Sequence, residues 1–113
     1  MPQYLVAIHH PDDHDPAVRE DDTMGRAIDA LNNEMVAAGV RVFVGGLRPV
    51  DNARSLRANP DGEVTVANGP YLQGREHVAG FWVLEVKSLE EALEWGRKAV
   101  IACRAPVEVR PFF

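Results

Sequence analysis

Histidine and aspartate side chains gather near the N-terminus, and both residue types transfer protons and bind metal ions. The segment reads HHPDDHD and supplies His9, His10, Asp12, Asp13, His14 and Asp15. This spacing matches no metal-binding signature, and a proline-bearing loop is typical of a solvated turn, so we predict no metal. His9 ends the preceding predicted strand, where α/β sheets tend to bind ligands, and imidazole exchanges protons near neutral pH. We therefore predict His9 as a candidate general acid or base.

A second polar group surrounds the turn Asn68-Gly69-Pro70-Tyr71, between two strand-like runs. Asn-Gly is a strong turn signal, and proline fixes the backbone before the tyrosine. One interpretation is a rigid connection between strands. The other is a ligand pocket, because six side chains that can form hydrogen bonds lie within ten residues. They are Asn68, Tyr71, Gln73, Arg75, Glu76 and His77. The pattern favours neither interpretation over the other.

Several other kinds of site lack their signals. The segment VGGLRP has neither the lysine nor the following helix of a phosphate-binding loop, although Arg48 within it is a candidate partner for an anion. Cys103 is the only cysteine, which excludes an internal disulfide and a zinc-thiolate cluster. It follows an apolar helical run, where a small buried side chain is the favoured role. The sequence indicates no cofactor.

The composition is typical of one soluble domain that spans residues 1–113. The net charge is −5, and residues 1–22 hold six acidic side chains against one basic side chain. Because no basic stripe is visible, we predict no direct contact with nucleic acid. No apolar run approaches the roughly 20 residues that span a membrane, and the N-terminal apolar run is typical of a strand. We therefore expect a cytoplasmic location.

Hydrophobic periodicity predicts an alternation of strands and helices. A strand over residues 3–9 precedes a helix that begins at Asp15-Pro16 or near Asp22 and ends at Gly39. A strand over 40–50, a polar hairpin over 54–66, a strand over 78–86, a helix that Ser88 caps and a short last strand follow. This order predicts an α+β protein with the ferredoxin-like βαββαβ arrangement and an inserted β-hairpin.

The predicted strands are apolar on both faces, whereas a ferredoxin-like sheet has helices on only one face. Residues 78–86, for example, place Val83 on one face and Trp82, Leu84 and Val86 on the other. A bare apolar sheet face of this size would be an association surface. We therefore predict a homodimer in which two sheets pack face to face as a dimeric α/β barrel.

The chain resembles the YCII-related proteins, and among them the DGPF subgroup, over nearly its whole length. The resemblance rests on the segments NGPYLQGREHVAGFWVLEVKSLEEALEWG and VEVRP. Asn68 and Gln73 stand where the subgroup has carboxylates, Tyr71 replaces phenylalanine and Arg75 replaces lysine, while Gly69, Pro70 and Glu76 agree. The amides keep the size of the side chains but remove their charge and any role as a general base. The resemblance implies the dimeric α+β barrel.

Two classes of function follow from the residues and from this resemblance. Some YCII-like members are small-molecule enzymes, including a lyase-type dehydrochlorinase, whereas DGPF relatives are associated with extracytoplasmic-function sigma factors. In the first class a small organic molecule would bind in a cleft between the sheet and its covering helix and loops, and His9 or Glu76 would abstract a proton. The residues expected to orient that molecule are Arg48, Asn68, Tyr71 and Arg75. The second class is a regulatory or interaction module without catalysis, and a pocket that has lost its function is a third outcome.

Overall fold

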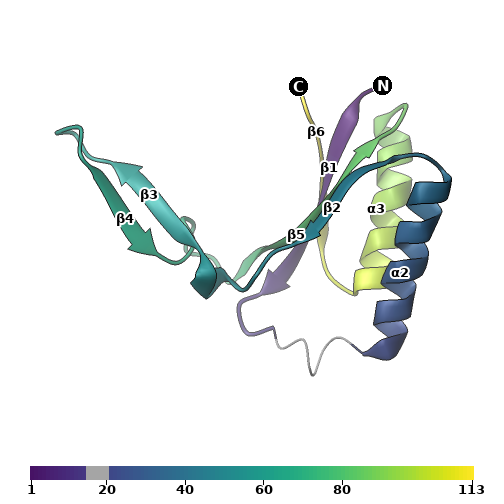
Figure 1. Cartoon of the computed structure of the whole chain (residues 1–113), viewed down its shortest axis with the longest axis horizontal. Helices are drawn as coiled ribbons and strands as arrows, with labels where there is room; N and C mark the ends of the chain where they lie inside the picture. The colour runs from purple at the N-terminus through teal and green to yellow at the C-terminus, as the bar shows by residue number, and fades with distance from the viewer. Residues whose placement is uncertain (15–20) are drawn as a thin grey trace.

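The computed structural model describes residues 1–14 and 21–113. In chain order the elements are β1 (Gln3–Pro11), α2 (Asp22–Ala37), β2 (Arg41–Gly46), a 3-10 helix (Val50–Asn52), β3 (Arg54–Ala58), β4 (Val64–Asn68), β5 (Glu76–Glu85), α3 (Leu89–Cys103) and β6 (Val107–Pro111). Figure 1 shows a four-stranded sheet with α2 and α3 on one side, which we call the body. Strands β3 and β4 project from it as a separate ribbon, and we call residues 54–68 the hairpin arm.

The sheet of the body has the strand order β2-β5-β1-β6, and every neighbouring pair is antiparallel. With the two described helices between the strands, this order is compatible with the ferredoxin-like βαββαβ arrangement. The mixed α+β class is thereby confirmed. The hairpin predicted over residues 54–66 is present as β3 and β4, inserted between β2 and β5.

The core lies between the sheet and the helices. Trp82, Leu84 and Val86 are almost completely buried on this face, as the alternation along β5 predicted, and Val6 of β1 lies beside them. The helices close the core with Met35 of α2 and with small residues of α3. Burial of such large apolar side chains is the dominant stabilising term in a domain of this size.

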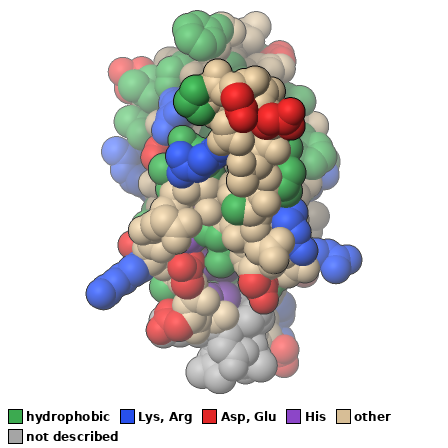
Figure 2. All heavy atoms as spheres, turned by 90° about the vertical axis from the view of Figure 1, so that its left-hand side faces the viewer, with side chains coloured by type: hydrophobic (Ala, Val, Ile, Leu, Met, Phe, Trp, Pro, Cys, Tyr) green, Lys and Arg blue, Asp and Glu red, His purple; other side chains and the backbone are tan. Residues whose placement is uncertain are grey.

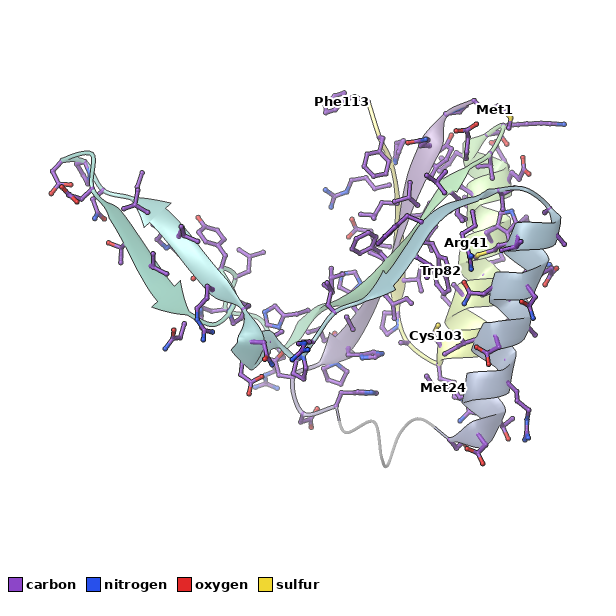
Figure 3. All side chains as sticks on the ribbon, viewed as in Figure 1. Met1, Met24, Arg41, Trp82, Cys103 and Phe113 are labelled. Atoms are coloured by element: carbon purple, nitrogen blue, oxygen red, sulfur yellow. The ribbon has the colours of Figure 1, made fainter. Side chains whose placement is uncertain are left out.

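A side-chain hydrogen bond from the core residue Trp82 joins the sheet to α2. The indole N–H of Trp82 donates a hydrogen bond of 2.9 Å to Oδ1 of Asn32, which also accepts from Arg41 at 3.2 Å. The amide nitrogen of Asn32 donates to the carbonyl of Ile28, one turn earlier in α2. In Figure 3, Trp82 and Arg41 lie on the helix side of the sheet. A buried indole N–H needs such a partner, so Asn32 fixes how α2 lies on the sheet.

Both helices begin at side-chain caps. Asp21 accepts the N–H of Met24 and caps α2, so the helix begins at the later of the two predicted positions. The earlier position, Asp15-Pro16, lies outside the described residues. Ser88 caps α3 through the N–H of Glu91, as predicted. None of the described helices is long and apolar enough to cross a membrane.

Helical periodicity after Ser88 predicts a buried stripe with Trp95 at its margin, and the buried face of α3 differs from it in part. The predicted stripe is Leu89, Ala92, Leu93, Gly96, Ala99 and Val100. Ala92, Gly96 and Ala99 are buried, but Leu89, Leu93 and Val100 of the same predicted stripe are 38–45% exposed. Trp95 is buried in their place. Gly96 explains the position of the helix, because a Cβ atom on it would lie 2.9 Å from a methyl group of Val109 in β6. The close approach of the helix to this strand rotates the larger side chains outward.

The opposite face of the sheet has no covering layer within the described chain. The register places Leu5 of β1, Val83 of β5 and Phe43 of β2 in one row, and Phe81 in the next row. The rings of Phe43 and Phe81 are 5.8 Å apart. Beside them β2 and β5 approach so closely that a Cβ atom on Gly80 would lie 2.9 Å from the carbonyl oxygen of Gly45. This face is apolar at its centre, which agrees with the predicted two-sided pattern.

Candidate functional site

The strongest candidate site is a pocket of about 290 Å³ between the body and the base of the hairpin arm, which we call the basal pocket. Three chain segments meet there: the end of β1 with the following turn, the segment after β2, and the start of β5. Histidine side chains reach the surface in the lower half of Figure 2, which views the molecule from the side of the arm. The lining residues are His10, Pro11, Asp12, His14, Gly46, Leu47, Arg48, Pro49, Val50, His77, Val78 and Ala79.

Asp12 and His77 form a hydrogen-bonded pair in the wall of this pocket. Nδ1 of His77 lies 2.6 Å from Oδ1 of Asp12, and Nε2 lies 2.8 Å from the carbonyl oxygen of Leu72. Because both ring nitrogens face acceptors, the arrangement is satisfied fully only by the imidazolium, which donates from both. The Leu72 carbonyl and then the Asp12 carboxylate raise the pKa of His77 above its ordinary value. The His77 side chain is 14% exposed.

The pair forms because of the ladder between β1 and β5, although 65 residues separate its members. His10 lies opposite His77, and Pro11 opposite Glu76. The ladder continues one step beyond the strands, where the N–H of Asp12 donates to the carbonyl of Arg75 at 2.7 Å. That bond brings the Asp12 carboxylate to the His77 ring.

Two more histidines line the same pocket. The rings of His10 and His14 stack with their centroids 3.9 Å apart and their planes 20° from parallel. The turn between them is closed by the N–H of His14, which donates to the carbonyl of Pro11 at 2.9 Å. Residues 10–14 therefore form a turn beside the pocket. Among the described residues, no group of three or more histidine, cysteine, aspartate or glutamate side chains is placed to hold a metal ion.

Arg48 adds a cation to the basal pocket. Its segment is held to the body by the N–H of Leu47, which donates to the carbonyl of Ala79 at 2.7 Å. Arg48 itself is exposed, and within the described part of the chain its guanidinium has no hydrogen bond or ion pair. The neighbouring walls are apolar, formed by residues such as Pro49 and Val78. The basal pocket therefore places the Arg48 guanidinium beside apolar surface.

The other predicted site residues lie elsewhere. His9 lines a second pocket, of about 340 Å³, with Met24 at the start of α2 and Cys103 at the end of α3, and its N–H donates to the carbonyl of Pro106. Cys103 is buried, as predicted. Glu76 is exposed at the start of β5 and lines neither of these pockets. His9 and Arg48 thus line different pockets, which share His10, Pro11 and His14.

The three predicted substrate-binding residues from the Asn-Gly-Pro-Tyr region are also exposed, and they line neither pocket. Asn68 ends β4 opposite Arg54. The ring of Tyr71 lies 4.4 Å beneath the guanidinium of Arg57, on the hairpin arm. Arg75 contributes its backbone carbonyl to the bond with Asp12. Gly69 has a φ of 98°, which glycine adopts without strain, and its N–H donates to the carbonyl of Ala53 at 2.9 Å.

Sequence reasoning placed Asp12 and His77 in two separate polar groups and did not pair them. The available signal was the antiparallel register: once the end of β1 is aligned with the start of β5, the two side chains become neighbours. That alignment depends on an irregularity between Ile8 and His9, where the register shifts. Hydrophobic alternation alone does not locate such a shift.

The fold and the pocket define an α+β protein with a body compatible with the ferredoxin-like fold, an inserted hairpin arm and a histidine-lined pocket at the base of the arm. The model of the YCII-related domain matches residues 3–112, and the chain therefore belongs to the YCII-related family. It is also similar to an uncharacterised protein from Rhizobium meliloti (strain 1021). The two are 34% identical over 94 residues, which cover 81% of this chain and 75% of the relative.

Proposed function

We propose that the basal pocket binds a small organic molecule that carries an anionic group. The observation that carries this proposal is Arg48, an exposed cation without a described partner, beside the doubly hydrogen-bonded ring of His77 in a pocket with apolar walls. A guanidinium binds a carboxylate through parallel hydrogen bonds, and the apolar wall favours an organic body over a bare ion. Leu47, Pro49 and Val50 supply that wall on the side of Arg48.

In the catalytic version of this proposal, the site performs proton abstraction or elimination. The Asp12–His77 pair has the form of an oriented acid–base group, but both ring nitrogens face acceptors. His77 therefore acts as a base only after Nε2 leaves the Leu72 carbonyl and loses its proton. His9 and Glu76 remain the other candidates for proton abstraction, and Asn68, Tyr71 and Arg75 for orienting a substrate. No cofactor enters this proposal.

A panel of small carboxylic acids tests the binding step, with thermal shift as a screen and calorimetry for the hits. We expect Arg48→Gln to weaken binding of a hit at least tenfold, because it removes the cation and keeps most of the side chain. Arg26→Gln, on the exposed surface of α2, is the matched control and should bind like the parent protein. Equal affinity in all three proteins would refute the role of Arg48.

Catalysis needs its own test, with any bound acid that is also converted. Asp12→Asn should reduce turnover if the Asp12–His77 pair moves the proton. The combination of His9→Gln and Glu76→Gln should abolish turnover if those residues do so. Both proteins must retain the circular dichroism spectrum and the mass in solution of the parent. Full turnover in both would remove Asp12, His9 and Glu76 from the reaction.

A second candidate function is a non-catalytic interaction module linked to transcription. The observation that favours it is the hairpin arm, whose apolar side chains are exposed in the described chain. The amides at Asn68 and Gln73, which replace carboxylates of the DGPF subgroup, also fit a protein without proton chemistry. Copurification of a sigma factor with the parent protein, together with a pocket that binds none of the acids, would favour this function.

We also propose that the chain is a DGPF-type member and a cytoplasmic homodimer without direct contact with nucleic acid. The retained Gly69-Pro70 pair supports the subgroup. The uncovered sheet face, with Leu5, Phe43 and Val83 in one row, supports a dimer in which two sheets pack face to face as a barrel. Light scattering tests the assembly: the expected mass at micromolar concentration is twice the 12.5 kDa of one chain.

A further inference from the structure

The hairpin arm has one apolar face that nothing in the described chain covers. The register pairs Leu56 with Val66 and Ala58 with Val64, and these alternate residues lie on the same face of the ribbon. Leu56, Val64 and Val66 are 61%, 57% and 61% exposed. Three aliphatic side chains on one face of two paired strands are typical of a buried sheet face, although this face is in solvent in the single chain.

The opposite face of the arm differs. Arg57 and Thr65 are paired there, and Thr65 accepts a hydrogen bond of 2.9 Å from the side chain of Asn59. The guanidinium of Arg57 lies over the ring of Tyr71, which belongs to the segment that returns to the body. This face is therefore polar and partly covered by the chain itself. The strands of the arm therefore alternate in the way that strands of a half-buried sheet do. The described chain supplies no layer that covers the apolar face.

We propose that a second copy of this chain covers the apolar face of the hairpin arm, so that each arm clasps the other subunit. This inference rests on the proposed homodimer. Figures 1 and 3 show that the arm leaves the body on the side of the sheet that the helices do not occupy. A subunit packed on the uncovered sheet face therefore lies beside the arm.

The areas of the arm's apolar face and of the uncovered sheet face indicate that one partner covers both surfaces. A standard interface buries about 800 Å² on each partner, which is more than three aliphatic side chains of a narrow ribbon can supply. The uncovered sheet face supplies the remainder, with Leu5, Phe43 and Phe81 among its residues. An isolated two-stranded hairpin is at best marginally stable in water. One partner that covers both surfaces explains why the arm is present as a ribbon.

Charge along the arm favours a copy of the same chain as that partner. The tip carries the acidic side chains Asp61 and Glu63, whereas Arg54 lies at the base, opposite Asn68 and on the same face of the ribbon as Leu56. A two-fold axis beside the arm would place two arms antiparallel, so that the acidic tip of each meets the basic base of the other. A contact between identical surfaces must be self-complementary, and this distribution of charge fulfils that condition.

Matched glutamate substitutions on the two faces of the arm test the inference by sedimentation equilibrium. Leu56→Glu and Val66→Glu place a charge in the proposed contact and should each raise the dimer dissociation constant at least tenfold. Thr65→Glu introduces the same charge on the opposite face and should leave the constant unchanged. Leu56→Ser, a milder change with an expected weaker effect, replaces Leu56→Glu if that variant fails to fold.

Hydrogen exchange gives a second measurement on the parent protein. Amides of β3 and β4 should gain protection as the protein concentration rises through the dissociation constant. A dimer that Leu56→Glu and Val66→Glu do not weaken, with arm amides equally exposed at all concentrations, would overturn the clasp and leave the sheet-face dimer intact. A parent protein that is monomeric at micromolar concentration would overturn both. Binding of acids in the basal pocket is measured separately and decides neither outcome.

Discussion

The body and the hairpin arm contain the same kind of structure, an antiparallel pair of strands with alternating apolar residues, in opposite surroundings. In the body, β5 alternates so that Trp82 and Leu84 are 2% and 0% exposed beneath the helices. In the arm, β3 and β4 alternate in the same way, yet Leu56 and Val66 are each 61% exposed. The difference teaches that alternation specifies which side chains share a face, whereas the covering layer depends on elements far away in the chain or outside it.

This difference also separates two sources of stability. The body contains its own covering layer, because α2 and α3 bury one face of the sheet. The arm is held by its ladder, by the turn at its tip and by a few side-chain contacts at its margins. We therefore expect substitutions in the body to change the free energy of unfolding directly. Substitutions on the apolar face of the arm should act mainly through assembly.

The largest expected effect compares two leucines, one from each region. Leu84→Ala removes a completely buried side chain and should lower the free energy of unfolding by about 2–5 kcal/mol. Leu56→Ala removes an exposed side chain and should change it by less than about 0.5 kcal/mol in dilute protein. Urea unfolding at two protein concentrations 100-fold apart provides the measurement. A large loss of unfolding free energy for Leu56→Ala at the lower protein concentration would show that the apolar face of the arm is covered within one chain.

A smaller effect is expected at the hydrogen bond that fixes α2 on the sheet. Asn32→Ala leaves the buried indole N–H of Trp82 without its acceptor. This change should lower the free energy of unfolding by about 1–3 kcal/mol. Asn32→Asp keeps an acceptor oxygen for Trp82 and Arg41 and should cost less. Asn52→Ala, in the exposed 3-10 helix near the arm, is the matched control and should be close to neutral. The midpoint of urea unfolding measures all three, and similar losses at Asn32 and Asn52 would contradict the assigned role.

The sequence allowed most of the body to be predicted because its signals are local. Ser88 caps α3 through an N–H three residues later, and Trp82 and Leu84 share a face two residues apart. The rotation of α3 was not predictable in this way. It depends on Gly96 meeting Val109 of a strand that follows the helix, and helical periodicity contains no information about that contact.

The candidate site was predicted less well, for a related reason. Arg48 was identified because an arginine in a glycine-containing turn is visible in the sequence. Asp12 and His77 are partners only through the register of β1 and β5, and that register shifts by one residue after Ile8. A shift of one residue changes which side chains meet, so an alternation pattern without the shift pairs the wrong residues.

The smallest expected effect concerns His77, which joins the two regions. It connects Asp12 of the body with Leu72, in the segment that returns from the arm. Because its pKa is raised in the folded protein, the connection is fully present below the ordinary histidine pKa of 6.5 and is lost as the pH rises through the folded value. Amides of residues 69–75 should therefore exchange faster above that pH, beyond the intrinsic base-catalysed increase.

Proton titration of the histidines by NMR measures this connection directly. His77 should titrate above 6.5, and Asp12→Asn should lower its midpoint without abolishing the shift, because the Leu72 carbonyl is the larger cause. His77→Gln keeps one amide donor that does not titrate, so exchange at residues 69–75 should lose its additional pH dependence. A His77 midpoint at or below 6.5 in the parent protein would mean that the ring does not donate from both nitrogens. His77 would then be available as a base at neutral pH, and body and arm would be joined by the backbone alone at this point.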